Sequence, residues 1–227
     1  MILALETATQ AASVCLWDER SARAVAETRD RVTTHSERLL PLVDEALRAA
    51  GLAAESLDAV ACGAGPGSFT GLRIGLSTAK GLCLALGKPL LLVSSLQALA
   101  ARAPDGAAAV ATIDAYKGEV YAGFYRGGSP PAALVDEVVA PAVQVALRMR
   151  ELFPSGEILL YGDAVTHWPE LSVSGARSDP RPPDAVEVAR LAAIRFLDGR
   201  FDDLASAAPR YIRPSEAEIN FPKNKDS

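Results

Sequence analysis

The chain has 227 residues, of which 49% are hydrophobic, and its formal net charge is −5. This length suits one large domain or two lobes of about a hundred residues each, and the acidic balance with scattered lysines and arginines argues against a strong nucleic-acid footprint. No apolar run reaches the roughly 18 residues that span a bilayer, and the N-terminus lacks a signal-peptide pattern, so we expect a cytoplasmic protein that does not bind membranes.

Apolar periodicity in the first half of the chain predicts a mixture of strands and helices. Thr34 and Glu37 form a T-x-x-E capping box at the start of one helix, and Gly51 is a natural residue to end it. The expected strands are residues 2–5, 12–17, 22–27, 57–62 and 89–93, and the expected helices are residues 35–50, about 70–86 and a segment after Ser94.

The second half of the chain repeats this order of elements. Strands are expected at residues 108–113, 119–125, 133–138 and 158–161, and helices at residues 142–152 and 184–197. Each half therefore follows the order β-β-β-α-β-α, and that order given twice is the pattern of an α/β protein with the actin-like (RNase H-like) two-lobed fold. We expect an N-terminal lobe at residues 1–104 and a C-terminal lobe at residues 105–227, whose tail could pack back on the first lobe.

The most distinctive segment is the glycine-rich stretch GAGPGSFTGLRIG at residues 63–75. A glycine-rich turn between a buried strand and a helix can place backbone N–H groups around an anion, which makes Gly65, Gly67 and Ser68 candidate nucleotide-binding residues. The segment lacks the GK[ST] ending of a Walker A loop. A tight strand-to-helix turn without a ligand is the alternative interpretation.

A second candidate for nucleotide binding follows the first expected strand, where the carboxylate of Glu6 is succeeded by the hydroxyls of Thr7 and Thr9. These groups could hold phosphate or metal-bound water. They could equally form a hydrogen-bonded turn, because threonine side chains satisfy backbone groups in turns.

Small residues recur at every fourth position of the helix that follows the glycine-rich turn. Gly71, Gly75, Ala79 and Cys83 form one ridge along it, although a glycine inside a helix costs about 1 kcal/mol relative to alanine. Such a ridge lets another backbone come close. The approaching backbone could belong to the chain's own sheet or to another subunit.

Several of these segments resemble the TsaB (YeaZ) family of tRNA threonylcarbamoyladenosine biosynthesis proteins. The similar segments are residues 1–17, 35–47, 63–90 and 113–125, and PRYIRP at residues 209–214 resembles the end of the family. Between residues 126 and 208 the resemblance is looser. This chain has Glu6 where the family usually has Asp, and Tyr116 where the family has Arg in its D-A-R-x-G-E segment.

The resemblance implies an inactive paralogue of TsaD, the subunit that transfers a threonylcarbamoyl group to adenosine 37 of tRNAs reading ANN codons. The family pairs with TsaD, and the ATPase TsaE joins the pair. We further expect a homodimer when TsaD is absent, because the partner surface is then left exposed. Contact with tRNA is expected only through the complex, and no cofactor is expected to bind tightly, although ATP or ADP could bind at a shared interface.

No metal site and no catalytic residue is expected in this chain. TsaD carries an H-x-x-x-H metal motif, and the matching positions here are Ser95 and Leu99, neither of which can replace an imidazole ligand. The two histidines, His35 and His167, are far apart in sequence, whereas a zinc site usually takes three or four ligands. Ser68 does not lie in a G-x-S-x-G elbow.

The partner surface is expected on the helix of residues 35–50 and the helix that begins near Thr70. The residues predicted to contact TsaD are His35, Leu39, Val43, Leu47, Gly71, Leu72, Gly75, Ala79 and Cys83. The scaffold interpretation competes with two others, a stand-alone actin-like ATPase or kinase relative and a glycoprotease-like enzyme. ATP turnover by the purified chain alone would separate the scaffold from the kinase.

Overall fold

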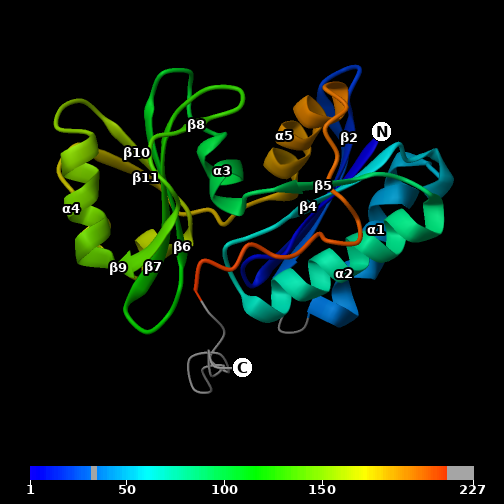
Figure 1. Ribbon diagram of the computed structural model, residues 1–227, viewed down its shortest axis with the longest axis horizontal. Helices are drawn as coiled ribbons and strands as arrows, with labels where there is room; N and C mark the ends of the chain where they lie inside the picture. The colour runs from blue at the N-terminus through cyan, green and yellow to red at the C-terminus, as the bar shows by residue number, and fades with distance from the viewer. Residues whose placement is uncertain (32–34, 214–227) are drawn as a thin grey trace, which may run out of the picture.

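The computed structural model describes residues 1–31 and 35–213, which form two α/β lobes side by side (Figure 1). The sheet of the first lobe has the strand order β3-β2-β1-β4-β5. In this sheet β1 is antiparallel to β2 and parallel to β4. Its strands are β1 (Ile2–Glu6), β2 (Ala11–Asp18), β3 (Arg23–Arg31), β4 (Ala59–Gly63) and β5 (Leu90–Val93).

The sheet of the second lobe has the same strand order and strand directions as the first. Its order is β11-β10-β6-β7-β8, with β9 also pairing with β7, and β6 is antiparallel to β7 and parallel to β10. The duplicated order predicted from the sequence is therefore present, and the second half has six strands where four were expected. The strands are β6 (Ala108–Asp114), β7 (Glu119–Arg126), β8 (Ala132–Ala133), β9 (Val138–Pro141), β10 (Ile158–Tyr161) and β11 (Ala176–Asp179).

Helices cover both faces of each sheet, and the last helix of each half packs on the sheet of the other half. The helices α1 (His35–Ala50) and α2 (Phe69–Leu86) cover one face of the first sheet, while α5 (Ala185–Leu197) covers the opposite face. The second sheet lies between α3 (Ser95–Ala100) and α4 (Ala142–Leu152). The two sheets fall on either side of residue 104, whereas α3 and α5 join the lobes.

The helix ends follow local chemistry. Ser68 caps α2 by accepting a hydrogen bond from the backbone N–H of Gly71, and Gly87 ends α2 in the left-handed conformation with φ of 63°. Asp184 caps α5 in the same way. Of the predicted T-x-x-E box, Thr34 lies outside the described residues. The short 3-10 helices are η1 (Ala54–Ser56), η2 (Asp163–Thr166) and η3 (Pro169–Leu171).

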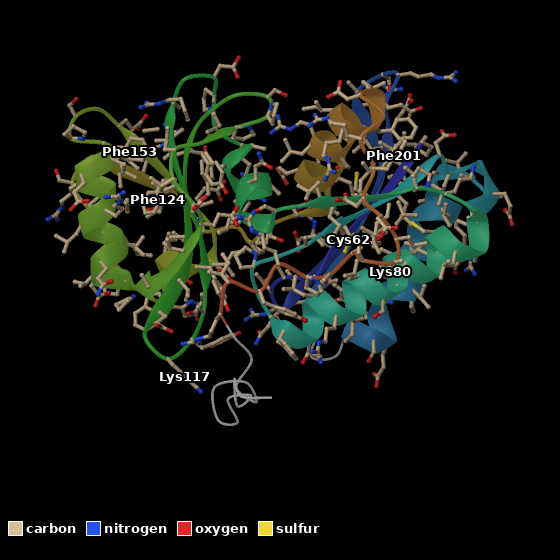
Figure 2. The ribbon with its side chains drawn as sticks, in the orientation of Figure 1. Cys62, Lys80, Lys117, Phe124, Phe153 and Phe201 are labelled. Atoms are coloured by element: carbon tan, nitrogen blue, oxygen red, sulfur yellow. The ribbon has the colours of Figure 1, made fainter. Side chains whose placement is uncertain are left out.

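The three cysteines, Cys15, Cys62 and Cys83, are free and buried; Figure 2 shows Cys62 inside the first lobe. Within residues 1–31 and 35–213, no helix is long and apolar enough to cross a bilayer.

After α5, the chain runs back over the first lobe and then reaches the second (Figure 1). The backbone N–H of Asp202 donates to the carbonyl of Leu90 at 2.9 Å, and the side chain of Asp202 accepts from the N–H of Leu92 at 2.7 Å. Further along, the ammonium of Lys80 on α2 donates to the carbonyl of Ala207 at 2.8 Å (Figure 2). We call residues 202–213 the C-terminal strap.

Candidate functional site

The carboxylate of Glu6 lies at the end of β1 and is fully buried. Its Oε1 accepts hydrogen bonds from the backbone N–H groups of Thr7 and Ala8, both at 2.7 Å. Its Oε2 accepts from the hydroxyl of Ser95, also at 2.7 Å. Burial raises the pKa of Glu6, and these three hydrogen bonds act in the opposite direction. The amides that could cradle a phosphate therefore have a partner within the chain.

The glycine-rich turn lies directly against this carboxylate and the turn after β1. A Cβ atom on Gly63 would stand 2.2 Å from Oε2 of Glu6, and one on Gly67 would stand 2.3 Å from the carbonyl oxygen of Ala8. The backbone N–H of Ser68 donates to the same carbonyl at 2.7 Å. Glycine is required at position 67 because two backbone segments meet there, and at position 63 because the carboxylate of Glu6 fills the space that a side chain would need.

The remaining nucleotide candidates also have partners inside the chain. The carbonyl of Gly65 accepts from the N–H of Ser95 at 2.9 Å, and the hydroxyl of Thr9 accepts from the N–H of Ala11 at 3.2 Å. The structure thus brings together the predicted residues of both turns. Their hydrogen bonds favour the interpretation of internally bonded turns over that of an open phosphate cradle.

The positions that match the TsaD metal motif lie in the interior. Ser95 has no exposed surface and is bonded to Glu6, and Leu99 is buried beneath the second sheet. No group of three or more His, Cys, Asp or Glu side chains within the described ranges, 1–31 and 35–213, could hold a metal ion. A hydroxyl and an alkyl chain thus stand where that motif has imidazoles.

The second lobe places its own carboxylates at the corresponding turn, after β6. Oδ1 of Asp114 accepts from the indole N–H of Trp168 at 3.1 Å, and the N–H of Asp114 donates to Asp163 at 3.1 Å. Nδ1 of His167 lies 3.7 Å from Oδ2 of Asp114. Lys117 stands at the tip of this turn (Figure 2). Sequence reasoning gave His167 no role because its neighbour Asp114 is far away in the chain.

The C-terminal strap ties the two lobes together beside these turns. The N–H of Arg210 donates to the carbonyl of Ala64 at 2.7 Å, and its guanidinium lies 3.4 Å from the buried carboxylate of Glu137 in the second lobe. The rings of Tyr211 and Phe69 stack with centroids 4.9 Å apart. Residues 209–213 of this motif therefore contact both lobes, whereas the sequence predicted only that the tail could pack back on the first.

The ridge of small residues on α2 faces this chain and not a partner, which corrects the predicted placement. A Cβ atom on Gly75 would stand 2.2 Å from Oγ1 of Thr7, and one on Gly71 would stand 2.2 Å from the carbonyl oxygen of Thr7. Ala79 and Cys83 are buried in the core of the first lobe. The backbone that approaches the ridge is the turn after β1.

Most of the other predicted contact residues are internal for the same reason. Leu39 and Val43 are buried against the first sheet, and Leu47 is half-buried beside them. Leu72 is buried in the cluster beneath α3. His35 begins α1, and its side chain lies outside the described part of the chain. Leu39, Val43, Leu47 and Leu72 therefore pack against the core of this chain.

The outer face of α1 and α2 carries a different set of side chains. Leu40 on α1 is 55% exposed and Leu84 on α2 is 72% exposed. A Cβ atom on Gly81 would meet nothing within 4 Å, so α2 is smooth and open at this point. Both helices lie on the outside of the first lobe (Figure 1). We call this surface the α1–α2 face.

Comparisons with known proteins place this geometry in a family. Residues 30–158 match the profile of TsaD, tRNA N6-adenosine threonylcarbamoyltransferase. The tRNA threonylcarbamoyladenosine biosynthesis protein TsaB of Escherichia coli is 35% identical, over 97% of this chain and 98% of that protein.

Solved structures give the same result. A Pseudomonas aeruginosa protein, described as similar to the peptidase YeaZ, superimposes with a TM-score of 0.81 at 34% identity, covering 93% of this chain and 99% of the other. A ROK hexokinase of Thermus thermophilus superimposes with a TM-score of 0.51 at 13% identity, covering 87% of this chain and 99% of the kinase. The predicted actin-like fold is therefore confirmed.

Proposed function

The chain belongs to the TsaB family of tRNA threonylcarbamoyladenosine biosynthesis proteins, and we propose that it is a non-catalytic scaffold that binds and activates TsaD. In this role it supports the modification of adenosine 37 in tRNAs that read ANN codons, with TsaE joining the pair. It touches tRNA only through the complex. The observation that carries the proposal is the outward-facing helix pair of the α1–α2 face, on which Leu40 and Leu84 are largely exposed, because exposed large apolar side chains favour burial by a partner.

A paralogue with the same fold would present an equivalent helix pair. Two such pairs can meet around a pseudo-twofold axis, so that each α1–α2 face covers the other. Leu40 and Leu84 would then be buried, and the smooth surface at Gly81 would allow close approach. When TsaD is absent, the same face would pair with a second copy of this chain to give a homodimer.

The turns around Glu6 support the non-catalytic part of the proposal. The Glu6 carboxylate accepts hydrogen bonds from the backbone N–H groups of its own turn. Buried Ser95 and Leu99 stand at the positions that match the histidines of the TsaD metal motif. We therefore propose that the chain alone neither transfers the threonylcarbamoyl group nor holds a nucleotide tightly. Any ATP or ADP would be bound at an interface shared with TsaD.

The test compares two leucines with nearly equal exposure. Leu84 on α2 is 72% exposed and Leu197 at the end of α5 is 71% exposed. Leu84→Arg should weaken TsaD binding by about tenfold or more, because it would place an unpaired charge in an apolar interface. Leu197→Arg should bind like the wild type, and both variants should retain their melting temperature.

Activity gives the second readout. Modified tRNA should form when this chain is combined with TsaD, TsaE and threonylcarbamoyl-adenylate, and Leu84→Arg should lower that yield. Product formed by this chain as the sole protein, or equal TsaD binding by both leucine variants, would contradict the scaffold proposal. ATP turnover by the chain alone would favour the kinase-like alternative.

A further inference from the structure

A cavity of about 220 Å³ opens at the edge of the second sheet, on the face that α3 covers only in part. Leu159 and Tyr161 line it from β10, and because they are two residues apart they point to the same side of the strand. Arg177 and Asp179 line it from β11. This cavity is separate from the turns around Glu6.

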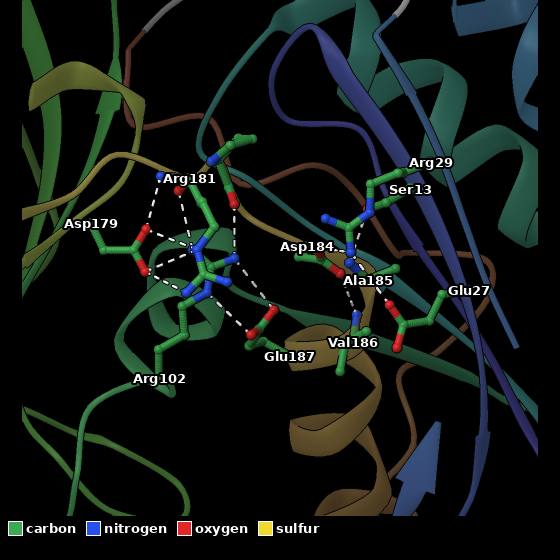
Figure 3. A network of polar contacts seen from close by, with 11 residues as sticks. Ser13, Glu27, Arg29, Arg102, Asp179, Arg181, Asp184, Ala185, Val186 and Glu187 are labelled. Atoms are coloured by element: carbon green, nitrogen blue, oxygen red, sulfur yellow. Dashed lines mark hydrogen bonds and ion pairs between the residues drawn. The ribbon is translucent and has the colours of Figure 1, made fainter. Parts of the chain in front are cut away.

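Three arginines and one carboxylate line this cavity, and each guanidinium has a carboxylate neighbour: Glu187 for Arg102, Glu157 for Arg177 and Asp179 for Arg181. Arg102 comes from the end of α3; its side chain is 8% exposed and is held by Glu187 at 3.1 Å and by the carbonyl of Pro182 at 2.8 Å. Arg181 binds Asp179 through two oxygens, at 2.9 and 2.6 Å (Figure 3).

The third guanidinium is much less constrained. The side chain of Arg177 is 75% exposed, and its carboxylate neighbour, Glu157, lies 3.8 Å away. Arg181 is held in place by Asp179, and Arg177 is less constrained. Both leave N–H donors available to a ligand, since each guanidinium carries five N–H groups.

The hydroxyl of Tyr161 provides an independent observation. Tyr161 as a whole is only 7% exposed and lines the cavity, and among the described residues its hydroxyl has no protein hydrogen-bond partner, so this hydroxyl is accessible to a ligand. Burial and Asp179 raise the pKa of this phenol, while the three arginines act in the opposite direction, which places the hydroxyl within their field.

We propose that this cavity binds the phosphate group of a small anion, which accepts hydrogen bonds from Tyr161, Arg177 and Arg181. The planar guanidinium fork suits phosphate oxygens, because it can donate two parallel hydrogen bonds to them. A volume of about 220 Å³ holds a phosphate with a modest substituent. The site does not depend on the proposed scaffold function, because it lies away from the α1–α2 face.

The test is calorimetric titration of the full-length protein with inorganic phosphate and with AMP, in phosphate-free buffer at constant ionic strength. One saturable site is expected. Tyr161→Phe removes only the hydroxyl, and loss of a hydrogen bond to a charged group should weaken binding by about tenfold. Arg177→Ala should weaken binding severalfold while leaving the fold intact, because its side chain is exposed. AMP binding tighter than phosphate would assign a phosphomonoester as the occupant.

The matched control is Arg48→Ala, which removes a 78% exposed arginine that pairs with Asp44 on α1. It should leave binding unchanged. No saturation by about 10 mM, where a ~1 mM site would be nearly full, overturns the proposal, as does binding that neither cavity variant weakens, which would mean an adventitious ion only. A short single-stranded RNA that binds more tightly than AMP and is weakened by the same variants would overturn the small-molecule assignment.

Discussion

Replacing Gly75 with alanine should destabilise the protein, whereas the same change at Gly81, six residues along α2, should stabilise it. The added methyl group at position 75 would lie 2.2 Å from Oγ1 of Thr7 and 3.4 Å from its Cβ and Cγ2 atoms. Thr7 is fully buried, and its hydroxyl donates to the carbonyl of Gly71 at 2.9 Å. At position 81 the methyl group would meet nothing within 4 Å.

The magnitudes follow from three terms. Alanine gains about 1 kcal/mol over glycine inside a helix at either position. At position 75, overpacking costs about 1–3 kcal/mol, and displacement of Thr7 would further cost about 0.5–1.5 kcal/mol through its hydrogen bond. Gly75→Ala should therefore lose roughly 1–3 kcal/mol of unfolding free energy, and Gly81→Ala should gain up to about 1 kcal/mol.

Urea unfolding, followed by circular dichroism and by tryptophan fluorescence, measures both changes in a single assay. Coincident curves from the two probes would show that the lobes unfold together, so that the midpoints report one free energy. Equal or greater stability of Gly75→Ala relative to Gly81→Ala would refute the contact between α2 and the turn after β1. The ridge would then be free to meet a partner, as the sequence first suggested.

Three further predictions test other parts of the fold. Burial raises the pKa of Glu6 above the ordinary value of 4.5, so the stabilising contribution of Glu6 is complete below pH 4.5 and is lost as the pH rises through the raised pKa. The urea midpoint of Glu6→Gln should therefore rise relative to that of the wild type as the pH is raised above 4.5. A difference between the two midpoints that stays constant with pH would contradict this. Asp202→Ala should lower the free energy of unfolding by about 1–3 kcal/mol, because the N–H of Leu92 loses its acceptor. The control Asp203→Ala removes hydrogen bonds to residues 205 and 206, and it should lower the free energy of unfolding by less in the same assay. Burial raises the pKa of Cys83 to about 11, so native protein should resist thiol reagents near neutral pH until urea unfolds it, and rapid labelling of folded protein would count against a buried thiol.

Much of the fold follows from local pattern. Alternation in residues 12–17 predicted a strand that the structure extends to Ala11–Asp18, and apolar spacing predicted α1 over the bounds observed. The edge strand β11 was missed because its four residues, Ala-Arg-Ser-Asp, carry no apolar signal. An edge strand of this kind forms through pairing with β10, which is a long-range contact.

The candidate site was harder to predict, since its partners are distant in sequence. Glu6 and Ser95 are 89 residues apart, and a carboxylate after a strand is compatible with both a phosphate site and an internal hydrogen-bonded turn. The ridge on α2 was ambiguous for a related reason. Small residues permit close approach from any direction, and only the position of Thr7 decides that the approach at Gly75 comes from within the chain.

The C-terminal strap restricts movement between the lobes, which favours the proposed scaffold role. Two-lobed proteins that enclose a ligand close by hinge motion. Here Arg210 is bonded to Ala64 in the first lobe and lies 3.4 Å from Glu137 in the second, while Arg213 pairs with Glu119 and donates to the carbonyl of Ala115 in the second lobe. Opening the lobes would separate these groups and expose a buried carboxylate. A structure held closed in this way keeps the outer helices in a fixed position, which lowers the entropy that a partner must overcome on binding.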